Sequence, residues 1–217
     1  AGRCRIDSVG FQWGGDPFIV GGALRLTPGD SAVYDVTIHS DNFDVARVSS
    51  FLPSDIRLEG RVGATIHATP AAVTGAVAFL GTTLRHASLG DHRLHEGRVI
   101  LGDGSRLSLL QIAVAAGDGA VVVDGEIGGS SASGARTLAL TATLRDASLT
   151  SLASLAGDRL NSAGLKILRG DADGSVEVRG TTDRPIVRGA LALKTAALET
   201  LGLTVDAIEG PVKFDSN

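Results

Sequence analysis

The sequence DGSVEVRGTTDRPIVRGALALKTAALETLGLTVDAIEGPVKF, residues 173–214, decides the fold class of this chain. Val176 and Val178 alternate with charged neighbours. The alternation continues further along at Val187, Leu191, Leu193, Leu203, Val205, Val212 and Phe214. A period of two with one apolar side is typical of strands that bury one face. Turn-forming residues at 180, 183–185 and 209–211 predict that the stretch is a β-meander of four or five short strands.

The order of these strands and turns resembles the repeating unit of the AsmA/TamB-like envelope proteins. That unit has a strand ending in Gly, a polar loop with Pro, and a strand of the form xGxLxL. A hairpin through an xGLxL strand and a Gly-containing turn into a last strand complete it. The positions that carry the resemblance are Gly180, Pro185, Gly189, Leu191, Leu193, Gly202, Leu203, Gly210 and Phe214.

An internal repeat is expected as well. When residues 74–101 are aligned with residues 188–214, Gly75 falls on Gly189 and the Glu-Gly pair at 96–97 falls on the pair at 209–210. Two copies of one supersecondary unit are typical of repeat architectures. We therefore predict two β-groove repeats, residues 1–127 and 128–217, on one continuous sheet.

Each predicted repeat contains one short amphipathic helix. In the first, near 41–52, Val45, Val48 and Leu52 are spaced three and four residues apart, Asp41 can cap the start and Pro53 ends the element. The second, near 148–156, has Leu149, Leu152 and Leu155 on one side and Gly157 after its end. About fourteen strands make up the rest.

Composition excludes several classes of partner. Charged residues are 20% of the chain, apolar residues 43%, and the net charge is −4, so the chain is expected to be ordered and lacks a basic patch for nucleic acid. The lone Cys4 cannot form an intrachain disulfide and is interpreted as an incidental thiol. No run approaches the ~20 apolar residues of a transmembrane helix. The chain has no Met, and we interpret it as an internal piece of a longer protein.

No motif points to catalysis or to a cofactor. His92, His95 and nearby His86 lack the spacing of a zinc site and are interpreted as surface histidines. Asp171 and Asp173 resemble the opening of a calcium loop, but the later carboxylates are absent, which favours a polar turn. The chain has neither a phosphate-binding glycine loop nor a GxSxG nucleophile elbow. We therefore expect no enzyme, no metal and no cofactor.

The candidate site is the apolar side of the strands, which in an ordinary sandwich would pack against a second sheet. In the family that the chain resembles, the sheet curls into an open groove that holds lipid acyl tails. Small aliphatic side chains and an aromatic content of 4% favour a smooth groove wall. The expected lining residues are Val62, Val77, Phe79, Val99, Val123, Leu140, Val176, Val178, Val187, Leu191, Leu193, Leu203 and Val205.

The fold class predicted is all-β: an elongated, curled, mostly antiparallel sheet with two short helices. The resemblance implies a non-catalytic segment of a periplasmic envelope protein, anchored in the inner membrane outside this segment. It would carry phospholipid between inner and outer membrane, or assist outer-membrane protein assembly and secretion. Its partners would be lipid acyl chains and an outer-membrane barrel. An extracellular β-solenoid or adhesin-like structural domain is the alternative.

Overall fold

A computed structural model describes residues 2–26, 33–47, 56–86, 90–102, 106–130, 134–156, 165–200 and 203–215. This part of the chain is almost entirely strand, with one α-helix, so the all-β class is confirmed. The first strands are β1 (Gly2–Trp13), β2 (Asp16–Leu26), β3 (Val33–Asp44), β4 (Ile56–Glu59), β5 (Arg61–Ala68), β6 (Val73–Phe79) and β7 (Thr82–His86). The rest are β8 (Gly90–Gly102), β9 (Arg106–Ala116), β10 (Gly119–Ser130), β11 (Arg136–Ser148), α1 (Leu149–Ala156), β12 (Leu165–Thr181), β13 (Pro185–Thr200) and β14 (Leu203–Asp215).

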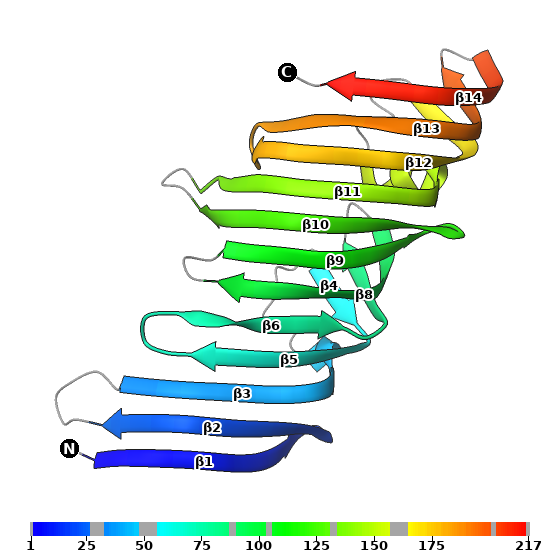
Figure 1. Cartoon of the computed structure of the whole chain (residues 1–217). Coiled ribbons are helices and arrows are strands. Elements are labelled where there is room, and N and C mark those ends of the chain that lie inside the picture. The colour runs from blue at the N-terminus through cyan, green and yellow to red at the C-terminus, as the bar shows by residue number, and fades with distance from the viewer. Residues whose placement is uncertain are drawn as a thin grey trace.

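The strands form a single open sheet in which neighbours in sequence are mostly neighbours in space (Figure 1). The main path runs β1-β2-β3-β5-β6-β8-β9-β10-β11-β12-β13-β14, and every pairing in it is antiparallel. The short strands β4 and β7 pair with each other beside this path, and β7 also pairs with β8. Twelve strands spaced about 4.8 Å apart make a wall about 53 Å long.

The wall is bent near one end of its strands. Register shifts interrupt the pairing between Ser40 and Phe43 in β3, and between Leu144 and Ala147 in β11. Further shifts lie in β8, β12 and β13. Such bulges bend a strand and increase its twist. Figure 1 shows the result on the right, where β8 and β14 turn away from the plane of the long strands.

The expected helix near 148–156 is confirmed, and the one near 41–52 is wrong where the chain is described. Residues 41–44 belong to β3, since Phe43 pairs with Val62 and extends the sheet. A short 3₁₀ turn at 45–47 follows, and the backbone N–H of Ala46 donates to the Asp44 carboxylate at 3.0 Å. Asp44 therefore caps the turn in place of Asp41. Residues 48–52 lie outside the described residues.

The meander at 173–214 is also longer in its strands than expected. Three strands, β12, β13 and β14, replace the four or five predicted. Gly180 lies inside β12, and the Glu-Gly-Pro stretch at 209–211 lies inside β14, with Pro211 opposite Ala192. Proline is tolerated there because β14 is an edge strand of the sheet. The predicted turn at 183–185 does separate β12 from β13.

Two groups of buried side chains fill the bend on one side of the sheet. The aromatic corner comprises Phe18, Phe43, Val45 and Val62. The helix corner comprises Ala116, Val121, Leu144, Ala147, Leu149, Ala172 and Ala196. Between them they hold most of the buried apolar residues of the described chain.

Most of the wall is not enclosed in this way. The chain exposes 13173 Å², whereas a compact protein of this mass is expected to expose about 9,300 Å². The difference follows from the topology, because each strand contacts mainly its neighbours and no second sheet of the described chain covers the wall.

Candidate functional site

The pairing registers bring apolar residues of neighbouring main-path strands together on one side of the sheet, here called the apolar face. A few, such as Ile100 and Leu110, point to the other side. Residues directly opposite in antiparallel strands point to the same side, and so do residues two apart in one strand. Val123 of β10 lies opposite Ala142 of β11, which lies opposite Val176 of β12. The other side carries charged residues such as Glu177 and Arg188, which pair with each other.

One line of large aliphatic residues crosses this face far from the bend. It passes directly from strand to strand and is here called the outer row: Ile38, Ile66, Gly75, Leu101, Leu107, Ile127 and Leu138. Its members are half-buried, except Ile38, which is exposed. Sequence reasoning did not select these residues. Their alternation along each strand was the available signal.

One position of the outer row is a glycine, because the backbone there leaves no room for a side chain. Gly75 has a φ of 154°, and a Cβ there would collide with the carbonyl oxygen of Thr65. The Cδ1 atom of Ile66 lies 3.0 Å from the position of that Cβ, so the Ile66 side chain covers the glycine.

The predicted lining residues divide between the wall and the bend. Val77 lies opposite Val99, and Leu140 opposite Val178, which lies opposite Val187, in a row next to the outer row. Val62 is fully buried in the aromatic corner, where Phe79 packs against it. Packed against the helix corner are Val123, Val176, Leu191 and Leu193. Leu203 and Val205 lie on β14 and are exposed.

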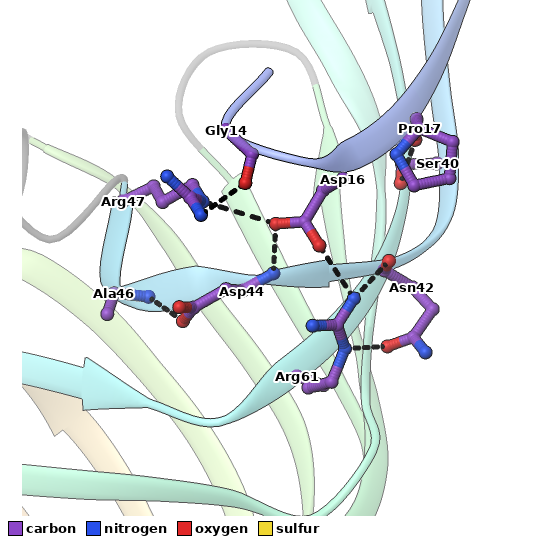
Figure 2. Close-up of polar contacts among 9 residues, drawn as sticks. All are labelled: Gly14, Asp16, Pro17, Ser40, Asn42, Asp44, Ala46, Arg47 and Arg61. Atoms are coloured by element: carbon purple, nitrogen blue, oxygen red, sulfur yellow. Dashed lines mark hydrogen bonds and ion pairs between the residues drawn. The ribbon is translucent and has the colours of Figure 1, made fainter. Parts of the chain in front are cut away.

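A carboxylate between two arginines holds the aromatic corner together (Figure 2). Asp16 accepts hydrogen bonds from the backbone N–H of Asp44 at 3.0 Å, from Arg61 at 2.8 Å and from Arg47 at 3.2 Å. Arg47 also donates to the carbonyl oxygen of Gly14 at 2.6 Å. The Asp44 N–H, followed by the Arg61 guanidinium, holds the pKa of the Asp16 carboxyl below its usual value. The network ties β2, β3 and β5 together at the bend.

A second charged group lies beside the helix corner. Lys194 of β13 forms ion pairs with Asp146 and Asp173. Asp173 also accepts the backbone N–H of Asp146 at 2.7 Å, at a position where Asp146 has a φ of 46°. The two carboxylates raise the pKa of Lys194, and the Asp146 N–H lowers that of Asp173. In both networks every charged side chain has a partner of opposite charge.

Four arginines near the hairpin connections differ from these. They lie at or next to the ends of β2, β9, β11 and β13 that are on the left in Figure 1: Arg25, Arg106, Arg136 and Arg184. None of the four forms an ion pair with a carboxylate of the described residues. The sequence analysis did not select them either.

No group of three or more metal-ligating side chains occurs among the described residues. Asp171 and Asp173 lie in β12, not in a loop. His92 is buried, so the expectation of a surface histidine is wrong for it, because it lies in β8 opposite Leu84. Cys4 is exposed on β1. A search of the described helices for a membrane-crossing segment finds none.

Comparisons with known proteins give no identification. No protein-family model matches the chain, and no curated protein or solved structure matches it.

Proposed function

We propose that this chain is a non-catalytic segment of a bacterial envelope protein of the AsmA/TamB type, whose apolar face holds lipid acyl chains. In that setting it would serve phospholipid transport between the two membranes, or outer-membrane protein assembly. Its place would be the periplasm, with an inner-membrane anchor elsewhere in the full-length protein.

The observation that carries the proposal is the uninterrupted apolar face. It crosses twelve strands, and in the outer row every residue is Ile, Leu or Gly. Protein interfaces usually have about one hydrogen bond per 100–200 Å². A row without polar side chains fits hydrocarbon better than it fits a protein partner.

We propose further that the chain holds two tandem copies of one unit. In the first half Gly75 pairs with Leu101, and in the second half Gly189 pairs with Phe214, the residues that the sequence alignment equates. The bends match as well. β3 has a bulge and then a turn capped by Asp44, while β11 has a bulge and then α1, which begins after Ser148.

An extracellular β-solenoid or adhesin-like domain is supported less well. The coils of a β-helix stack in parallel strands. Every pairing in this sheet is antiparallel, and neighbours are joined by hairpins.

Two residues of β11 offer a matched test. Leu140 and Leu144 share the apolar face, but Leu140 is half-buried in the open wall and Leu144 is buried in the helix corner. Leu140→Arg is expected to leave the thermal unfolding transition in place and to abolish bound lipid. Leu144→Arg is expected to unfold the helix corner, because an unpaired charge in a dry site costs several kcal/mol.

The measurements are circular dichroism melting and native mass spectrometry after incubation with phosphatidylglycerol vesicles. A parent chain that carries no lipid would contradict the proposal. If light scattering instead shows a stable dimer that Leu140→Arg dissociates, the apolar face is covered by a second copy and not by lipid.

A further inference from the structure

The hairpin edge of the wall combines hydrocarbon and positive charge at one place on the apolar face. Arg136 begins β11, and its side chain follows the alternation of Leu138 and Leu140, so it points to the apolar face. It lies two residues beyond Leu138, the last side chain of the outer row, and it is half-buried.

The neighbouring β12–β13 hairpin is fixed against Arg136 by backbone bonds. The N–H of Thr182 donates to the carbonyl oxygen of Arg136 at 2.9 Å, and the N–H of Arg136 donates to the Thr182 hydroxyl at 3.2 Å. Within the same turn the N–H of Arg184 donates to the carbonyl oxygen of Thr181 at 3.1 Å. Arg184 therefore pairs with Thr181, which lies opposite Thr137, so its side chain points to the other side of the sheet from Arg136.

The positive charges of Arg136 and Arg184 have no acidic partner among the described residues. Asp183 is exposed in the turn, yet neither Arg136 nor Arg184 forms an ion pair within the described residues. At the bend the arginines behave differently, since Arg47 and Arg61 are both bound to Asp16. Arginine donates in a planar fork that suits carboxylate and phosphate.

Apolar side chains lie directly beside Arg136 on the same face. Leu138 lies opposite Gly180, which in turn lies opposite Pro185. Gly180 has no side chain, so the surface is low between Leu138 and Pro185. From Leu138 the outer row continues to Ile127, Leu107 and Leu101. Those four neighbouring strands span about 14 Å, close to the ~15 Å of hydrocarbon in one bilayer leaflet.

We propose that Arg136 binds the anionic headgroup, phosphate or carboxylate, of an amphiphile whose alkyl chain lies along the outer row. This inference rests on the proposed function and narrows it to anionic lipids. The chain would cross the strands, with its headgroup in water at the hairpin edge and its tail on the apolar face.

The test compares ligands that share a tail and differ in headgroup. Dodecyl phosphate, dodecanoate and neutral dodecyl maltoside are titrated calorimetrically into the full chain below their micelle concentrations, with inorganic phosphate alone as a fourth ligand. We expect the anionic amphiphiles to bind about tenfold more tightly than the maltoside, as charge-assisted hydrogen bonds predict. Phosphatidylglycerol against phosphatidylcholine vesicles then separates a phospholipid source from a free fatty acid.

Arginine variants locate the headgroup. Arg136→Gln is expected to remove most of the tenfold preference and Arg184→Gln none of it, while binding of the maltoside stays unchanged. Arg98→Gln is the matched control, because Arg98 is exposed and lies opposite Ala78 and Leu110 on the other side of the sheet. If Arg136→Gln does not fold, Arg136→Lys is measured in its place, and it should keep a weaker preference because lysine lacks the planar fork of arginine.

The outcomes separate the two proposals. If no amphiphile binds, the proposed function itself is contradicted. If all amphiphiles bind equally, or the preference survives in Arg136→Gln, the headgroup site is wrong, while the proposal that the apolar face binds hydrocarbon is unaffected. If inorganic phosphate binds as tightly as dodecyl phosphate, the outer row takes no part in binding and the inference is overturned.

Discussion

The two corners of the bend solve the same packing problem with different side chains. In the aromatic corner, the rings of Phe18 and Phe43 lie 5.3 Å apart and cover Val62. In the helix corner, Ala147, Ala172 and Ala196 are almost completely buried, and Leu149 of α1 packs with them. Rings bridge the gap in one corner. In the helix corner, α1 fills the gap, because the small alanine side chains let the helix backbone approach the strands closely.

This difference predicts opposite responses to a change in side-chain volume. The aromatic corner should suffer most from a loss of volume, and the helix corner from a gain. It also assigns different roles to charge, since Asp16 lies within its corner whereas Lys194 lies on an exposed part of the surface beside the other one.

The largest effect is expected from Phe43→Ala. Removal of a buried phenyl ring leaves a cavity and costs about 3–5 kcal/mol. The free energy of unfolding is measured by urea denaturation, with Phe11→Ala as the control, because Phe11 stacks on Phe18 but is 44% exposed. Equal losses for the two variants would show that the corner is not a packed core.

A smaller effect is expected from Ala172→Leu in the helix corner. Ala172 is fully buried, and added methyl groups in a packed site cost about 1–3 kcal/mol. Ala190→Leu on β13 is the matched control, since Ala190 is exposed. Should Ala172→Leu be neutral, the contact between α1 and the sheet is looser than the structure describes, and the contrast between the corners weakens.

The smallest effect concerns the charge in the aromatic corner. Because the folded-state pKa of Asp16 lies below 3.8, its ionised form stabilises the corner above that pH, and this contribution is lost as pH falls through the folded-state pKa. Asp16→Asn should therefore lower the urea midpoint at neutral pH and remove part of the acid-induced loss. Asp7→Asn, at an exposed ion pair with Arg5, should change neither. An unchanged acid dependence in Asp16→Asn would contradict the assignment.

Alternation in the sequence was sufficient to predict the all-β class and an extended antiparallel sheet. It failed at strand ends, where local signals compete with pairing. The Gly and Pro at 210–211 normally indicate a turn, yet β14 is an edge strand and accommodates both. The helical spacing at 41–52 is real, but Phe43 extends β3 because it gains Val62 as a partner.

The candidate site could be predicted only in outline. Alternation identifies apolar residues, but it does not say which of them the bend buries. That division depends on bulges at 40–43 and 144–147, and a bulge has no clear signature in one sequence. The arginines near the hairpin connections could not be selected from the sequence for a related reason. Whether Arg136 has a carboxylate partner depends on contacts between hairpins, which the sequence does not give.

The open topology has a mechanical consequence. Inter-strand hydrogen bonds point along the length of the wall, so tension between β1 and β14 passes through each ladder in series. Between β6 and β8 the described pairing covers only residues 75–78 with 98–101, whereas β12 and β13 pair over most of their length. A protein stretched between two attachment points would therefore separate in the first half of the wall before β12 separates from β13. β7 follows β6 after residues 80–81 and pairs with residues 90–94 of β8, so it adds a second, separate stretch to the same connection.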